Sequence, residues 1–201
     1  RVCFSARMDT VRGASPEEIR VKMEKAFSGA KYQPVRFTGG ILSSVVPELS
    51  APVTACAAAY CTGPILAVSP ALKTGLVMDV PHPEKVGRDR IVDAAAAAAH
   101  YPLPVVTVDM GTATTFNVVD ERRHFLGGVI CPGLSTGLRA LNERCAQLPP
   151  VRLGVPKAAI GTDTQSCMLS GAVLGAAALI DGITDRIEAQ LGRPVTLVVT
   201  G

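Results

Sequence analysis

Apolar residues along this chain occur in two patterns. Short continuous runs are typical of buried strands, and longer segments with apolar residues three or four positions apart are typical of helices. The strand-like runs cover residues 41–46, 65–68, 105–109, 114–119, 127–130 and 195–200. The helix-like segments cover residues 15–27, 47–59, 89–100, 133–146 and 163–191. Because strands are followed by helices in both halves of the chain, we predict α/β layering with a domain boundary near residues 100–104.

The first helix has a start signal in the sequence. Ser15 can cap the helix, Pro16 then occupies the first helical position, and Glu18 follows at the third. The helix should continue to about residue 27. Three apolar side chains fall on one face of it: Ile19, Met23 and Phe27.

Composition narrows the class of protein. Of the 201 residues, 48% are hydrophobic and 18% are charged, which indicates a folded globular chain. The net charge is +3 and tryptophan is absent, so we expect no nucleic-acid-binding surface. No apolar run has bilayer-spanning length and no signal peptide opens the chain, so we expect a cytoplasmic protein without a membrane partner. The six cysteines form no CxxC pair, which favours reduced thiols over disulfides.

A turn rich in glycine and threonine follows the apolar run 105–108. Its sequence, DMGTATT at residues 109–115, delivers Asp109 onto a turn at Gly111. Glycine lets a ligand approach the backbone, and successive N–H groups in such a turn can bind phosphate oxygens. Asp109 could hold a cation, and Thr112 and Thr114 could donate hydrogen bonds to phosphate. An ordinary hairpin turn is the alternative interpretation.

A second candidate segment opens the alanine-rich helix at residues 89–100. It reads Gly87-Arg88-Asp89-Arg90. An acid at a helix start is typical of a cap, but a carboxylate beside two guanidinium groups also stays ionised. Asp89 could then accept a proton from an attacking hydroxyl, and Arg90 could bind a substrate carboxylate with two parallel hydrogen bonds.

Four segments in this order resemble the type III pantothenate kinases, members of the acetate/sugar kinase, Hsp70 and actin superfamily. They are residues 84–90, 109–115, 127–133 and 160–164. The resemblance extends from about Ile41 to Gly201. It implies two ribonuclease-H-like (actin-like ATPase) domains with mixed sheets and flanking helices, at residues 1–100 and 101–201, here without the N-terminal strands.

The resemblance also implies the reaction and its residues. The family phosphorylates pantothenate with ATP and Mg²⁺ in the first step of coenzyme A biosynthesis. Asp89 corresponds to the catalytic aspartate and Asp109 to the ligand of a monovalent cation, K⁺ or NH₄⁺. The residues that correspond to pantothenate ligands are Gly87, Arg88, Asp89, Arg90 and Thr164. The ATP-contacting turn corresponds to Gly111, Thr112 and Thr114. In the family the threonine matching Thr164 reaches the partner subunit's site, so a homodimer is expected. From local sequence alone, Thr162 or Asp163 would cap the helix there.

The chain departs from the family pattern in several places. The Asp-x-Gly-Asn-Thr phosphate loop that opens the family is absent, and the ends at Arg1 and Gly201 are typical of an internal fragment, which we expect to be inactive alone. Arg88 replaces the usual alanine. Val80 lies about where many members of the family have a tyrosine, His82 where asparagine is common, and Asn117 where aspartate is usual. Two alternative functions therefore stay open: an inactive regulatory or binding homologue, and a sugar or acetate kinase of the superfamily.

Overall fold

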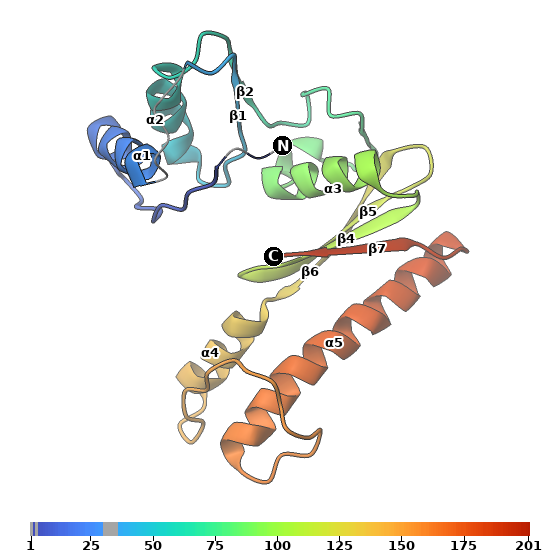
Figure 1. Cartoon of the computed structure of the whole chain (residues 1–201). Coiled ribbons are helices and arrows are strands. Elements are labelled where there is room, and N and C mark those ends of the chain that lie inside the picture. Colours follow the sequence, from blue (N-terminus) through green and yellow to red (C-terminus); the bar gives the residue numbers. More distant parts are fainter. Residues whose placement is uncertain (1, 3, 30–35) are drawn as a thin grey trace. The chain divides into compact units, whose positions relative to one another are not determined.

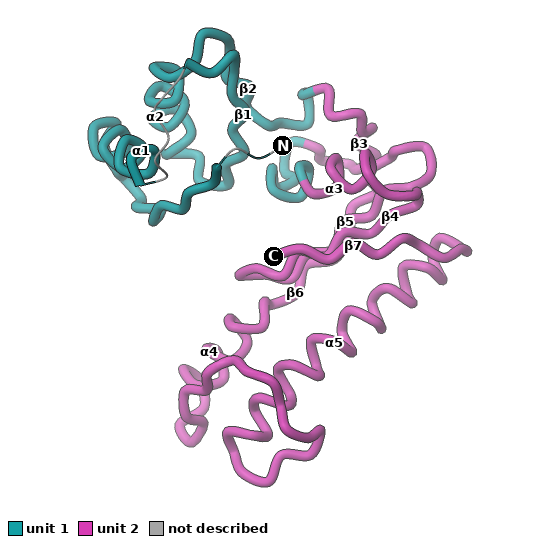
Figure 2. The backbone as a smooth tube through the Cα atoms, in the orientation of Figure 1, with its two compact units in different colours: residues 1–72, 84–92 teal, residues 73–83, 93–201 magenta. Residues whose placement is uncertain are grey.

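The computed structural model describes residues 2, 4–29 and 36–201 of the chain. These residues form two compact units, which Figure 2 shows in different colours. The first unit comprises residues 1–72 and 84–92, and the second comprises residues 73–83 and 93–201. The domain boundary near residues 100–104 stays a prediction.

In the first unit, two helices accompany a short parallel sheet. The helices are α1 (Pro16–Gly29) and α2 (Pro47–Ala58), and the strands are β1 (Gly40–Leu42) and β2 (Ile65–Ala67) (Figure 1). The apolar run at residues 41–46 was expected to be a longer strand. It leaves the sheet after Leu42 because β2, its only partner among the described residues, is equally short.

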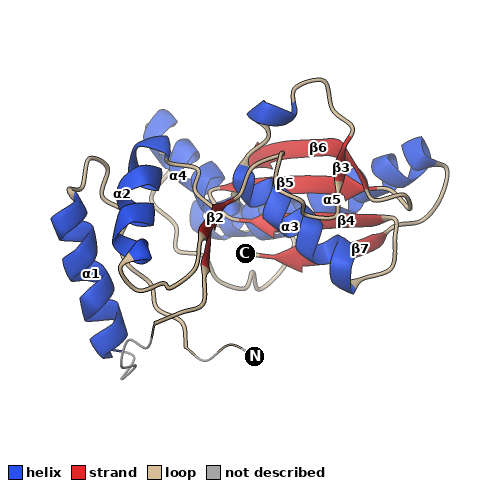
Figure 3. Cartoon of the chain, turned by 90° about the horizontal axis from the view of Figure 1, so that it is seen from above, coloured by secondary structure: helices blue, strands red, loops and turns tan. Residues whose placement is uncertain are grey.

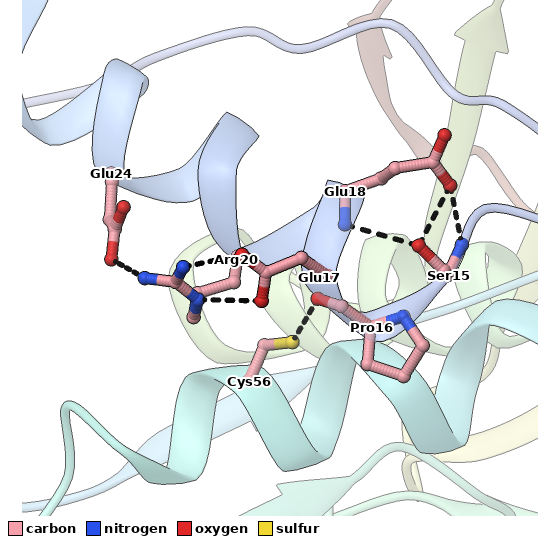
Figure 4. Close-up of polar contacts among 7 residues, drawn as sticks. All are labelled: Ser15, Pro16, Glu17, Glu18, Arg20, Glu24 and Cys56. Carbon is pink, nitrogen blue, oxygen red and sulfur yellow. Dashed lines mark hydrogen bonds and ion pairs between the residues drawn. The ribbon is translucent and has the colours of Figure 1, made fainter.

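The predicted start of α1 is confirmed (Figure 4). The Ser15 hydroxyl accepts a hydrogen bond from the Glu18 backbone N–H at 3.3 Å, and the Glu18 carboxylate accepts one from the Ser15 backbone N–H at 2.7 Å. This reciprocal pair is a capping box. The Cys56 thiol of α2 donates to the carbonyl oxygen of Pro16 at 3.1 Å and so links the two helices.

The second unit contains a five-stranded mixed sheet with the order β3-β6-β5-β4-β7 (Figure 3). Its strands are β3 (Val77–Met78), β4 (Val105–Met110), β5 (Ala113–Val119), β6 (His124–Pro132) and β7 (Thr196–Thr200). The central hairpins β4–β5 and β5–β6 are antiparallel. Strand β7 pairs in parallel with β4, and β3 pairs in parallel with β6. This arrangement confirms the expected α/β fold with mixed strands. Strand β3 lies outside the strand-like runs predicted from the sequence, because two residues are too few to show a period.

Helices cover both faces of this sheet (Figure 1). On one face, buried side chains of β4 and β5 pack against apolar residues of α5 (Thr164–Leu191), including Leu179 and Ile183. On the other face lies the part of α3 (Arg88–His100) that belongs to the second unit, with Ala94, Ala97 and Ala98 buried. One polar pair is buried in the sheet, where the Asn117 amide donates to the Thr107 hydroxyl at 3.0 Å. The second unit therefore has a layered core that fixes the position of β4 and its terminal acid.

Helix α5 is also the one helix among the described residues that is long and apolar enough to cross a membrane by length and composition. The sequence predicted this helix but no segment of bilayer-spanning length, because Thr, Ser and Gly residues interrupt its apolar residues. Its C-terminal half packs on the sheet through Leu179, Ile183 and neighbouring apolar residues. The remaining elements are a short 3₁₀ turn, η1 (Pro83–Lys85), before α3, and the helix α4 (Leu134–Arg144) after β6.

Candidate functional site

The first group of candidate residues lies at the start of α3. Asp89 is exposed, and its Oδ1 accepts a hydrogen bond from the Arg90 backbone N–H at 2.9 Å. The carboxylate lies back over Gly87, because a Cβ atom placed on that glycine would come within 2.4 Å of Asp89 Oδ1. Gly87 therefore creates the space in which the carboxylate rests. Asp89 thus accepts a hydrogen bond within the first turn of α3 and also remains exposed to a ligand.

The two arginines of this segment have different surroundings. The Arg88 side chain donates from Nη1 to the carbonyl oxygen of Ser44 at 2.8 Å. Arg90 is half-buried, and this burial lowers the pKa of its guanidinium, while the nearby Asp89 carboxylate opposes the shift. Arginine stays protonated at neutral pH despite such shifts. Arg90 therefore offers a partly desolvated cation beside Asp89.

The second group lies where β4 turns into β5. In the antiparallel register, Asp109 faces Thr115 and Met110 faces Thr114, with Gly111 and Thr112 exposed at the tip. On the other side of β4, Thr200 pairs with Asp109. Asp109 therefore has a threonine opposite it on each neighbouring strand. Carboxylate and hydroxyl oxygens are donors that hard cations prefer.

Two residues outside the predicted site hold this turn in place. The carbonyl oxygen of Thr112 accepts hydrogen bonds from the Gly133 backbone N–H at 3.0 Å and from the Thr136 hydroxyl at 2.8 Å. A Cβ atom on Gly133 would lie 2.2 Å from the Gly111 carbonyl oxygen. Gly133 lies in the segment 127–133 that forms part of the family resemblance, but the sequence assigned it no role. No sequence signal marks Thr136. The start of α4 therefore supports the tip of the turn.

Thr114 lies apart from the exposed tip. It is 5% exposed and borders a groove of about 590 Å³ between α4 and α5. The groove is lined mostly by apolar and small residues, including Leu138, Gly171 and Gly175. A contact between Thr114 and ATP stays a prediction.

Thr164 is exposed at the first position of α5. The cap of this helix is Asp163, whose carboxylate accepts from the Ser166 backbone N–H at 2.9 Å, while the Ser166 hydroxyl accepts from the Asp163 N–H at 3.1 Å. The structure thus selects Asp163 from the two predicted caps. Thr164 keeps its hydroxyl available at the helix start.

The Asp163 cap gives a prediction about acid stability. Hydrogen bonds from Ser166 lower the pKa of Asp163 in the folded protein. A carboxyl with a lowered folded pKa stabilises the protein fully above its unfolded value, about pH 4, and loses this effect as pH falls through the lowered pKa. Asp163→Ala should therefore lower the melting temperature at pH 7 and have a smaller effect at pH 2. Asp163→Asn keeps an acceptor and serves as the control. A melting-temperature difference that is equal at both pH values would contradict the assignment.

The structure gathers the candidates into separate groups. Residues 87–90 belong to the first unit, although the helix α3 that they open continues into the second. Residues 109–114 and Thr164 belong to the second unit. Among the described ranges, no three His, Cys, Asp or Glu side chains form a cluster that could hold a metal ion. Any cation at Asp109 would therefore depend on hydroxyl, carbonyl or ligand oxygens as well.

Comparison with known proteins identifies the family. The family model for type III pantothenate kinase matches residues 1–186, so the chain belongs to this family. A type III pantothenate kinase from Hyphomonas neptunium is 44% identical over 167 residues, covering 83% of this chain and 66% of that protein. Those from Exiguobacterium sp. and Brevibacillus brevis are 37% and 38% identical, and each alignment covers 97% of this chain and 76% of the relative. The chain thus spans two thirds to three quarters of the length of these relatives.

Proposed function

We propose that this chain carries the substrate-binding segment and the cation-binding turn of an ATP-dependent pantothenate kinase. The product would be 4′-phosphopantothenate, formed in the first step of coenzyme A biosynthesis in the cytoplasm. The observation that carries the proposal is the exposed Asp89 carboxylate, resting on Gly87 beside the half-buried Arg90. Family membership supplies the substrate, because the matched relatives are named for pantothenate.

The residues have distinct roles in this proposal. Asp89 accepts a hydrogen bond from the primary hydroxyl of pantothenate and takes its proton as the phosphoryl group is transferred. Arg90 binds the substrate carboxylate, and its partial burial strengthens that interaction by limiting competition from water. Gly87 leaves the space that the Asp89 carboxylate needs.

The turn at residues 109–115 would serve the nucleotide. Asp109 would hold K⁺ or NH₄⁺ together with other oxygen atoms, and the exposed Gly111 and Thr112 would contact ATP. Mg²⁺, when bound, neutralises charge on the transferring phosphoryl group. The chain contains no Asp-x-Gly-Asn-Thr loop to hold it.

A homodimer follows from the same proposal. Small residues of α5, Gly171, Ala172, Gly175 and Ala176, line the groove between α4 and α5, and small residues allow close helix packing. Thr164, exposed at the start of α5, would contact pantothenate in the partner subunit's site.

Activity is best tested in a completed protein. We define it as this chain joined to the flanking segments of the Brevibacillus brevis relative, to which it aligns over 197 residues. We propose that the 201 residues alone do not phosphorylate pantothenate and that the completed protein does. The assay measures ATP-dependent formation of 4′-phosphopantothenate with Mg²⁺ and K⁺. Binding of pantothenate without turnover in the completed protein would instead support a regulatory homologue.

The space above Gly87 gives a further prediction. In Gly87→Ala the new methyl group would displace the Asp89 carboxylate, since the two would otherwise lie 2.4 Å apart. The carboxylate can rotate away, so stability should be nearly unchanged while kcat of the completed protein falls about 10-fold. Gly29→Ala is the matched control, because nothing lies within 4 Å of a Cβ atom there. Unchanged kcat in Gly87→Ala would show that this carboxylate position is not required.

A further inference from the structure

Helix α4 is capped by the turn between β4 and β5, because its own N-cap residue is a glycine. Gly133 has no side chain that could bind the first turn of the helix. Its backbone N–H donates to the carbonyl oxygen of Thr112 at 3.0 Å. In a capping box, a side chain at the third helical position accepts the N–H of the N-cap residue. The Thr112 carbonyl oxygen supplies that acceptor here, so the turn and the start of α4 form one unit.

The residue at the third helical position of α4, Thr136, binds the same oxygen atom. Its hydroxyl donates to the Thr112 carbonyl oxygen at 2.8 Å, so the side chain reaches out to the turn and not back to Gly133. Thr136 is half-buried, and a hydrogen bond that is partly shielded from water is stronger than an exposed one. Two donors from the start of α4 therefore hold a single carbonyl group of the turn.

These two bonds fix the orientation of the peptide unit between Thr112 and Ala113. This peptide is trans, and in a planar trans peptide the C=O and N–H groups point in opposite directions. Because α4 holds the carbonyl oxygen, the Ala113 N–H points away from α4, and Ala113 is partly exposed. Backbone N–H groups in such turns bind phosphate oxygens. If the peptide turned over, the turn would present a carbonyl oxygen on that side, which phosphate oxygens repel.

We propose that Thr136 is a positioning residue for the nucleotide: it keeps the peptide between Thr112 and Ala113 in the orientation that directs an N–H to an ATP phosphate. This inference rests on the proposed function, which places ATP at this turn. Thr136 acts through the Thr112 carbonyl group and does not contact the nucleotide itself. A purely structural role, in which its hydroxyl only anchors α4, is the alternative. The two roles predict different effects when the hydroxyl is lost.

The test compares nucleotide affinity among three variants of the completed protein. Thr136→Val removes the hydroxyl and keeps the shape of the side chain, and Thr136→Ser keeps the hydroxyl. Ser135→Ala is the matched control, because it removes a hydroxyl from the adjacent, exposed position of α4. Calorimetric titration with the Mg²⁺ complex of AMPPNP, an ATP analogue that is not hydrolysed, gives a Kd without turnover. We expect the Kd to rise about 5-fold in Thr136→Val, the effect of losing one hydrogen bond, and to change less than about 2-fold in the other two variants.

Steady-state kinetics add a readout that a structural role would not change. In Thr136→Val the KM for ATP should rise by the same factor as the Kd for AMPPNP. The KM for pantothenate and kcat at saturating ATP should stay close to those of the unaltered protein, because only nucleotide binding is weakened. Denaturant unfolding of the same variant measures how much the hydroxyl contributes to stability. A loss of stability with an unchanged Kd for AMPPNP would show that Thr136 only anchors the helix, and would overturn the proposal.

The other outcomes separate this proposal from the proposed function. Equal weakening of AMPPNP binding in Ser135→Ala would overturn the role of Thr136, as would binding in Thr136→Ser as weak as in Thr136→Val. Absence of AMPPNP binding to the unaltered completed protein would overturn it as well. If that protein binds AMPPNP but does not phosphorylate pantothenate, the proposed function fails, while the Kd values of the variants still decide the role of Thr136.

Discussion

Replacing Asp89 by asparagine is expected to lower kcat for pantothenate phosphorylation by the completed protein about 1,000-fold, within the range of general base contributions. The amide cannot take a proton from the substrate hydroxyl, although it occupies the same space above Gly87. The KM for pantothenate should change little, because Arg90 still binds the carboxylate. Steady-state kinetics of the purified variant give both constants.

An exposed acid elsewhere provides the matched control. Asp185 lies on the exposed side of α5, and Asp185→Asn makes the same chemical change outside the proposed site. Its kcat should equal that of the unaltered protein. A less than 10-fold loss in Asp89→Asn would indicate that Asp89 is only a helix cap, the alternative that the sequence left open.

The second large effect is expected for Gly133→Ala. The added Cβ atom would lie 2.2 Å from the Gly111 carbonyl oxygen and 2.6 Å from that of Thr112. Both neighbours are backbone atoms, which cannot rotate away as a side chain can. The turn between β4 and β5 must therefore shift, at a cost of about 3 kcal/mol, the upper end of the costs measured for overpacking. Denaturant unfolding of the 201-residue chain measures this loss.

The same variant should also affect nucleotide binding. A displaced turn moves Thr112, so the KM for ATP should rise in the completed protein while the KM for pantothenate changes less. Gly137→Ala is the control, since it lies one turn further along α4 and nothing lies within 4 Å of a Cβ atom there. If Gly133→Ala were as stable as Gly137→Ala, the close backbone contact at Gly133 would be refuted.

Local sequence signals predicted much of the fold. The capping box of Ser15 and Glu18 is observed, because it depends only on residues three positions apart. The strands β4 and β5 follow from apolar runs that are buried on both faces of the sheet. A capping box and an apolar run each depend on residues close together in the chain, so both can be recognised in the sequence.

Contacts between distant segments were not predictable in the same way. The bond from Arg88 to Ser44 joins residues 44 positions apart, and Thr136 meets Thr112 across 24 positions. Neither pair has a characteristic spacing, so only the folded arrangement brings the two residues together. Motifs and the family resemblance supplied the proposed catalytic and binding residues. The residues that contact them from distant parts of the chain, Ser44 and Thr136, could not be predicted from the sequence.

The central claim is that this chain carries the pantothenate-specific part of a kinase, and substrate choice tests it most directly. The completed protein is supplied with ATP, Mg²⁺ and K⁺, and offered pantothenate, acetate or a hexose in separate reactions. Mass spectrometry then identifies the phosphorylated product. We predict 4′-phosphopantothenate and no acetyl phosphate or sugar phosphate. Phosphorylation of acetate or of the sugar in place of pantothenate would contradict the claim.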